Sequence, residues 1–383
     1  LKSPSFPAST KLFQSRGFPE PLASAPPTAI MAPKKPPPPG TEEVRLPRLT
    51  DPVGQALQFM SALMFASYFW FGPAMGCGMA MVSPVGLNLL GWRGCAAVVG
   101  AYLAQLLLYR PQLSRGWPAA LLYSRLTDYV AHYYDATCIR EGPKLDPSRQ
   151  YMFAMYPHGV YGVCRAFTGG VELWGELFPG IRLRWGSFGM AFYLPGVREF
   201  SLLAGVLDAS KPVLTRAIRR GENIALLPGG LDEMALTDGT SKDTKLVARK
   251  GFVALSIEHG MDIVPGFCFG EKWIHKTVQL PGFIQGFLRR WKMSGTMLKG
   301  RGPSFLGFLG VPLGFVWAEP IRVKKMNPAE NKAYVDEVFA EVEVATRELF
   351  ERYKERFGYG PEETLSMIPV EEAKVGGRHA KSS

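Results

Sequence analysis

The chain lacks the residue patterns that mark metal, disulfide and nucleic-acid sites. Cysteine is scarce, and no Cys-x-x-Cys pair occurs among Cys77, Cys95, Cys138, Cys164 and Cys268. This favours a reducing compartment with packed thiols. None of the 5 histidines has the spacing of a metal-binding pair. No zinc finger or RNA-binding signature is present, so the net charge of +11 indicates an anionic bilayer or a phosphate-rich small molecule. We expect neither a metal nor a bound cofactor.

The N-terminal stretch lacks a regular apolar pattern. Residue 1 is Leu, and the stretch through Ile30 is rich in Pro and Ser and holds a single acidic residue, Glu20. Met31 opens a sequence that resembles a start, so we expect residues 1–30 to be translated leader, with a plastid-type transit peptide as the alternative. Residues 1–50 and the tail 368–383 are predicted to be disordered.

Charge is absent from two long runs, residues 56–83 and 94–109. About 20 apolar residues cross a bilayer core. Basic residues flank the pair on both outer sides, at Lys34, Lys35, Arg45 and Arg48 before it and at Arg110, Arg115 and Arg125 after it. Because basic flanks stay in the cytosol, we predict a transmembrane hairpin over residues 51–110 with both ends cytosolic. A re-entrant loop and a buried core helix are the alternatives.

A third uncharged run covers residues 302–318. Its glycines and prolines argue against a regular spanning helix. A buried strand-rich segment is one interpretation, and an element that dips into the membrane is the other.

Beyond Arg110, short apolar runs alternate with helical patterns. Strands are predicted over 151–156, 182–188, 223–227 and 262–269, and helices over 210–221, 243–259 and 327–358. This order predicts an α/β domain over 111–367 with a mainly parallel sheet. Ligands of such sheets bind beyond the carboxyl ends of the strands. His158 and Gly229 each follow a predicted strand, so both should line one edge.

Five motifs occur in a fixed order in this domain. They are Tyr156-Pro157-His158-Gly159, then 195–198 (PGVR), 229–233 (GGLDE), 249–252 (RKGF) and 264–271 (VPGFCFGE). In this order they resemble the type 2 diacylglycerol acyltransferase family, which also holds monoacylglycerol and wax-alcohol acyltransferases. The resemblance covers residues 51–367. Tyr156 departs from it, since animal members carry a first histidine there.

The resemblance implies a glycerolipid-acyltransferase-like fold and a catalytic role for His158. The wider glycerolipid acyltransferases carry His-x4-Asp, but Val163 stands at the acid position here. An orienting acid must then come from elsewhere. Glu233 is the first choice, with Asp232 and Glu199 behind it. A helix N-terminal acid favoured by the dipole is the structural alternative for Glu233.

The residue types suit acyl transfer to an alcohol. A neutral imidazole can take the proton of a hydroxyl as it attacks a thioester. Backbone N–H groups near Gly159 or Gly229-Gly230 could hold the oxyanion, although the glycine pair could also be a plain turn. Arg198, Arg249 and Lys250 are candidates to meet the phosphates of acyl-CoA. The complete predicted substrate-binding set is Tyr156, Pro157, Gly159, Arg198, Gly229, Gly230, Asp232, Arg249 and Lys250.

The predicted function is acyl-CoA-dependent esterification of diacylglycerol to triacylglycerol at the endoplasmic reticulum membrane, with lipid droplets as a second location. The phosphate-gripping Thr-Arg of related enzymes is replaced by Leu231-Asp232, which suits an acceptor without phosphate. The alternatives are a monoacylglycerol or wax-alcohol acceptor, or a non-enzymatic hairpin protein that binds neutral lipid. The expected partners are acyl-CoA, diacylglycerol and membrane lipid, and homo-oligomerisation is left open.

Overall fold

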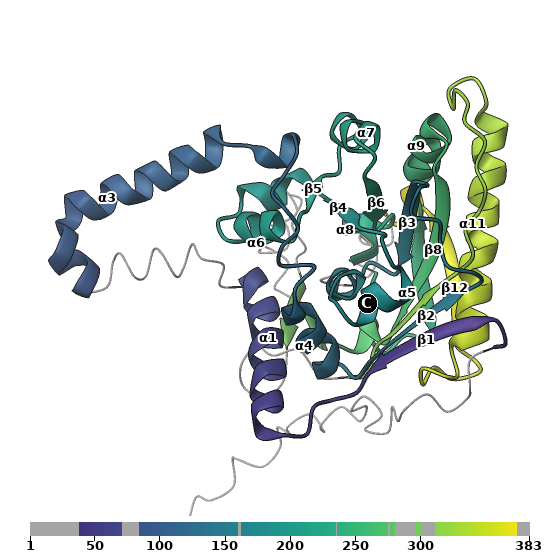
Figure 1. Ribbon diagram of the computed structural model, residues 1–383, viewed down its shortest axis with the longest axis horizontal. Helices are drawn as coiled ribbons and strands as arrows, with labels where there is room; N and C mark the ends of the chain where they lie inside the picture. The colour runs from purple at the N-terminus through teal and green to yellow at the C-terminus, as the bar shows by residue number, and fades with distance from the viewer. Residues whose placement is uncertain are drawn as a thin grey trace, which may run out of the picture.

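The computed structural model describes residues 38–70, 84–159, 162–234, 236–274, 276–279, 296–299 and 311–373. A twisted sheet runs through the body, and helices lie on both of its faces (Figure 1). In spatial order its strands are β1 (Thr41–Leu46), β2 (Ala136–Glu141), β11 (Gly314–Trp317), β8 (Asp262–Phe269), β3 (Tyr151–Tyr156), β6 (Asn223–Leu226), β4 (Leu183–Ser187) and β5 (Leu207–Asp208).

The sheet is mainly parallel, as the sequence predicts. Only the pairs β1–β2 and β8–β11 are antiparallel within it, among the residues that the structure describes. Strands β3, β4, β6 and β8 coincide with the four predicted strands to within one residue at each end. Helix α7 (Lys211–Arg219) likewise begins after the predicted cap, Ser210.

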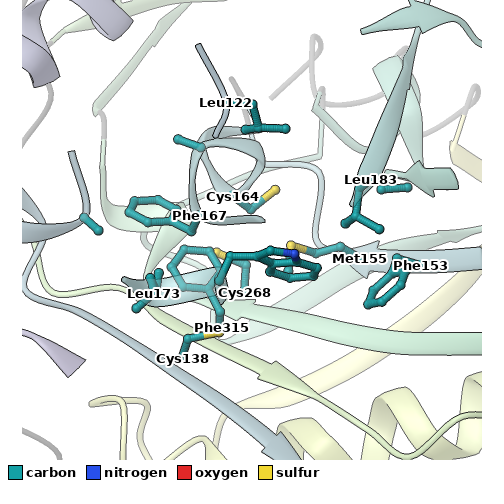
Figure 2. Packing of buried hydrophobic residues seen from close by; sticks show 14 of the residues in the cluster. Leu122, Cys138, Phe153, Met155, Cys164, Phe167, Leu173, Leu183, Cys268 and Phe315 are labelled. Atoms are coloured by element: carbon teal, nitrogen blue, oxygen red, sulfur yellow. The ribbon is translucent and has the colours of Figure 1, made fainter. Parts of the chain in front are cut away.

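Two hydrophobic cores form because strand side chains alternate between the faces of the sheet. From β3, Phe153 and Met155 pack beneath α4 (Arg125–Tyr133), η2 (Val163–Thr168) and α5 (Leu173–Leu177). Figure 2 shows part of this core, with Phe153, Phe167 and Phe315 among the labelled side chains. Met152 and Tyr156 face the opposite way, toward α7, α9 (Gly251–His259) and α11 (Lys332–Tyr353).

The predicted helix over 243–259 is wrong in its first half. Asp243–Ala248 forms β7, which pairs in parallel with β12 (Thr364–Pro369) in a separate two-stranded sheet, and only Gly251–His259 is helical. The segment becomes a strand because β12 supplies the backbone partners, and these lie far away in the sequence. The last helix is also shorter than the predicted 327–358, since α11 begins at Lys332 and ends at Tyr353.

The expectation of disorder through residue 50 is not met over Thr41–Leu46. These residues form β1, which runs antiparallel to β2. Ion pairs hold it there, since Glu43 accepts 2.7 Å hydrogen bonds from Arg356, and Glu42 contacts Arg140. Both arginines are buried, so their charges need these partners. The predictions for residues 1–37 and 374–383 lie outside the described residues.

The predicted membrane hairpin is not confirmed. In the described part of the chain, one helical stretch, Val85–Leu113, is long and apolar enough to cross a membrane, and 6% of its most apolar window is buried. It includes α3 (Pro84–Leu108), which extends away from the body (Figure 1). Helix α1 (Pro52–Trp70) instead packs beside α4 and buries Gln58, Ser61 and Ala62. Residues 71–83, between them, lie outside the described residues.

The third uncharged run contains a buried strand. Its end, Gly314–Trp317, is β11, which lies between β2 and β8 with all four residues buried. The strand-rich interpretation therefore holds for these residues. The part of the run before residue 311 lies outside the described residues.

Replacing Phe153 by Ala should lower the free energy of unfolding by about 3–5 kcal/mol, because the change opens a cavity in a well-packed core. The Phe153 ring is fully buried and lies edge-on to Trp317 and Phe178, with centroids 5.2 and 5.7 Å away. Val344, on α11, is 54% exposed, so the control Val344→Ala should change stability by about 0.5 kcal/mol or less. Denaturant titration of the purified variants measures both, and equal losses would contradict the assignment of Phe153 to the core.

Candidate active site

Three adjacent parallel strands bring the candidate site together. Strand β3 lies between β8 and β6 and runs parallel to both, so their carboxyl ends meet at one edge of the sheet. His158 follows β3, Gly229 follows β6, and Glu271 follows β8. The shared edge that the sequence predicts for His158 and Gly229 is therefore present, and this is where α/β sheets bind ligands.

The imidazole of His158 is half-buried and held in one tautomer. Its Nδ1 lies 3.0 Å from the carbonyl oxygen of Gly159. A carbonyl only accepts hydrogen bonds, so Nδ1 carries the proton and Nε2 carries a lone pair. Burial, helped by the positive charge of Arg165, lowers the pKa of His158 from 6.5 to about 4. The ring is therefore neutral near pH 7 and can accept a proton at Nε2.

Glu233 holds the backbone of His158. It lies on the short helix α8 (Gly230–Met234), and its side chain is buried. Its carboxyl group accepts hydrogen bonds from the N–H groups of His158 and Val247, the second at 3.0 Å. Burial raises the pKa of Glu233 to about 7. Glu233 is predicted to orient the ring, but the ring instead donates its Nδ1–H to the carbonyl of Gly159.

Glu271 ends the last of the five motifs, and the sequence predicts no role for it. It opens η4 (Glu271–Trp273), and its buried carboxyl accepts a 2.8 Å hydrogen bond from the N–H of Val163. It also accepts one from the thiol of Cys268, at 3.2 Å. Burial raises its pKa to about 7. Its place directly after a strand on the shared edge is the signal that could have found it.

Two glycines let these carboxyl groups approach the backbone. Gly159 has φ +59°, and a Cβ there would collide with the side chain of Glu271. A Cβ on Gly229 would collide with the side chain of Glu233. Positive φ is cheap only for glycine, and close approach needs the missing Cβ. Both motif glycines therefore leave room for the side chains of Glu271 and Glu233 beside the backbone.

Arg165, on η2, was missed by the sequence analysis. Its positive charge lowers the pKa of both His158 and Glu271. Its Nε donates to the carbonyl of Gly162 at 3.3 Å. No motif marks this residue, because its place depends on how the chain turns after β3.

Asp232 and Arg249 lie together beside Glu233. Arg249 donates to the carboxylate of Asp232, and its side chain is 40% exposed. Its positive charge offsets part of the rise that burial causes in the pKa of Glu233. Lys250 instead pairs with Asp336 on α11, at 2.7 Å. The N–H of Gly230 donates to the carbonyl of Leu227 at 3.2 Å and is thus already engaged.

Two predicted binding residues do not reach the site. Tyr156 is buried in the core toward α9 and α11, and its hydroxyl has no partner among the residues that the structure describes. Arg198, on α6 (Val197–Leu203), is fully buried and donates to Glu199 at 2.6 Å and to the carbonyl of Tyr109 at 2.7 Å. Its guanidinium is used to attach α3, so it is not available for a phosphate. Glu199, a second-choice orienting acid, is occupied in the same way.

Comparisons with known proteins agree with the motif order. The family model described as "Diacylglycerol acyltransferase" matches residues 94–368. The chain is 29% identical to diacylglycerol O-acyltransferase 2 of Mus musculus, over 57% of this chain and 61% of that protein. It is 25% identical to the Xenopus laevis protein of the same name, over 63% and 70%. It is 27% identical to 2-acylglycerol O-acyltransferase 3 of Homo sapiens, over 62% and 73%.

The match to the mouse relative spans less than two thirds of that protein's length. None of the solved structures matches the chain. The family match nevertheless covers more than half of the chain and includes His158, Glu233 and Glu271. The chain therefore belongs to the diacylglycerol acyltransferase family.

Proposed function

We propose that this protein transfers an acyl group from acyl-CoA to the free hydroxyl of diacylglycerol, with His158 as the general base. The single observation that carries the proposal is the imidazole at the sheet edge. Its Nδ1 is 3.0 Å from the carbonyl of Gly159, which leaves Nε2 as the acceptor of a proton. Membership of the family supports the reaction class.

The proposed reaction needs one proton carrier and one cation. Nε2 takes the proton of the alcohol while its oxygen attacks the thioester carbonyl. The tetrahedral intermediate then collapses, the C–S bond breaks, and the coenzyme A thiolate recovers the proton from the imidazolium. In this proposal Arg165, whose positive charge acts on His158, attracts the negative charge that develops on oxygen and then on sulfur. Glu233 and Glu271 are positioning residues, because they hold the backbone around His158.

The acceptor is inferred from the charges beside the base. A phosphate dianion is usually held by a bidentate arginine. Here the carboxylate of Asp232 occupies Arg249, so a phosphate would meet a neutralised arginine and a negative charge. An acceptor whose headgroup is only a hydroxyl fits better. Monoacylglycerol is the second candidate, favoured by the likeness to 2-acylglycerol O-acyltransferase 3.

The proposed location is the cytosolic face of the endoplasmic reticulum membrane, with lipid droplets as a further site. Helix α3 supports a membrane location, since it is apolar and largely exposed. Diacylglycerol stays in the bilayer because each buried CH₂ contributes about 0.8 kcal/mol. An enzyme acting on it must work at that surface.

An acceptor assay tests the proposed function. Membranes containing the protein are incubated with labelled acyl-CoA and with diacylglycerol, monoacylglycerol, a long-chain alcohol or lysophosphatidic acid in turn. Triacylglycerol should be the main product. Comparable rates with lysophosphatidic acid would place the chain in another branch of acyltransferases. No product with any acceptor would favour a neutral-lipid-binding protein.

Replacing His158 by Gln should lower the transfer rate by about 10²–10⁴-fold, because the amide cannot take the proton. His259, on α9 and away from the shared edge, provides the matched control His259→Gln, which should keep its activity. Initial rates are compared at equal amounts of membrane-inserted protein. A His158→Gln protein that turns over normally would remove the proposed mechanism.

Replacing Glu233 by Gln should reduce kcat about tenfold or more, equivalent to about 1.4 kcal/mol, while the KM for acyl-CoA changes less. The amide has one oxygen where the carboxyl uses two, so one of the N–H groups of His158 and Val247 loses its acceptor. Asp232→Asn is the matched control. If the control loses activity and Glu233→Gln does not, the wrong acid has been assigned.

Part of the activity should persist into mild acid. The pKa of His158 is lowered from 6.5 to about 4, so the base stays neutral until the pH approaches the lower value. As the pH falls, protonation of Glu233 and Glu271 near pH 7 should lower kcat/KM in part, and the remaining activity should be lost only toward pH 4, where His158 takes up a proton. Measuring the pH profile with a thioester stable in this range checks the prediction. Complete loss of activity along a single acid limb centred at 6.5 would show that the pKa of His158 is not lowered.

A further inference from the structure

Five large apolar side chains are exposed on two neighbouring short helices. They lie on or beside η3 (Gly189–Tyr193) and α6, which pack against each other. Each is between 36% and 44% exposed, and together they form what we call the apolar shelf: Phe188, Met190, Tyr193, Leu194 and Leu203. Clustered exposed apolar groups mark a surface that meets another apolar phase.

Helix α6, which carries Leu203 of the apolar shelf, is attached directly to the exposed helix α3. Tyr102, on α3, donates to Glu199 at 2.9 Å, and Arg198 donates to the carbonyl of Tyr109 at 2.7 Å. Arg198 also reaches Gln105 at 3.3 Å. Near its end α3 exposes Leu103, Leu107 and Leu108, at 47%, 51% and 83%. The shelf thus continues the apolar surface of a helix that fits a bilayer.

Positive charge and aromatic rings surround the junction between α3 and the shelf. Arg216 donates to the carbonyl of Leu113 at 2.6 Å, and Arg110 lies over the ring of Tyr193, 5.6 Å from its centroid. Trp117 donates to the hydroxyl of Tyr109 at 3.2 Å. Arginines attract anionic headgroups, and Trp and Tyr gather at the level of the headgroups. These residues favour a lipid surface over a second copy of the chain.

The shelf also lies at the same edge of the sheet as the candidate site. Segment η3 follows the carboxyl end of β4, and β4 runs parallel to β6, which runs parallel to β3. His158 follows β3 at that edge. A membrane contact there would bring the bilayer to the side of the molecule where the base lies.

We propose that the apolar shelf inserts into the headgroup and upper acyl region of an anionic phospholipid leaflet. It forms a second membrane contact beside α3. The body then lies against the bilayer with the shared strand edge facing it. A further consequence, which rests on the proposed function, is that a membrane-dissolved acceptor reaches His158 along the shelf without crossing water.

Depth-dependent quenching tests the insertion without reference to activity. A fluorescent amino acid is introduced by codon suppression at Met190, at Leu103 on α3 and at Glu348 on α11. The full-length proteins are placed in nanodiscs of phosphatidylcholine and phosphatidylserine, with or without doxyl-labelled lipid. The emission at positions 190 and 103 should shift to the blue and be quenched by doxyl lipid. The emission at position 348 should show neither change.

Two outcomes would overturn the proposal. Solvent-like emission at position 190, with position 103 quenched, would mean that only α3 contacts the membrane. Emission at 190 that is shifted to the blue but not quenched would mean that protein, such as a second copy, covers the shelf. Failure of the acceptor assay leaves the quenching result unaffected, so the two proposals fail separately.

A charge variant tests the route of the acceptor. Met190→Glu with Leu194→Glu should reduce transfer to long-chain diacylglycerol while sparing a short-chain, water-dispersed one. Val344→Glu on α11 is the matched control, since Val344 is 54% exposed and lies on a helix that covers the opposite core. Equal losses with both acceptors would contradict the route along the shelf, whereas the quenching measurement still decides the insertion.

Discussion

The candidate site depends on two buried carboxyl groups that accept backbone N–H groups from one loop. Glu233 holds the N–H of His158, and Glu271 holds that of Val163. Glu233 lies on α8, which follows β6, and Glu271 follows β8, so His158 and Val163 are held from the two strands that flank β3. Because a buried donor without an acceptor costs about 1–3 kcal/mol, the loop has a strong preference for this arrangement. The two acids position the backbone of His158, and the hydrogen bond to the carbonyl of Gly159 orients its imidazole.

Much of the sheet could be predicted because its central strands are short apolar runs bounded by Pro or Gly. β3 ends at Pro157 and β6 is followed by Pro228, and the edge they share follows from their parallel pairing. β1 and β7 could not be predicted in the same way. Each opens with three polar residues, and its partner, β2 or β12, lies far along the chain, so only the tertiary fold makes it a strand.

The sequence predicts that His158 and Glu233 lie near each other, but it does not predict which of their atoms form the hydrogen bond. His158 and Glu233 meet, as expected, but through the backbone N–H and not through the ring. Arg198 was predicted to bind a phosphate. The sequence does not show that this side chain is buried and bonded to Gln105 and to the carbonyl of Tyr109. Glu271 stood in a quoted motif, yet its role became visible only when β8 was placed beside β3.

The large sheet cannot be completed during synthesis until strand β11 has been made. It is the only described link, within the sheet, between the β1–β2 pair and the strands from β8 to β5, since it pairs with β2 on one side and β8 on the other. β1 and β2 leave the ribosome early, whereas β11 spans Gly314–Trp317. Until those residues emerge, the sheet exists as two pieces with open inner edges. Unpaired edges promote association with other chains, so the nascent protein is exposed to such association until β11 is available.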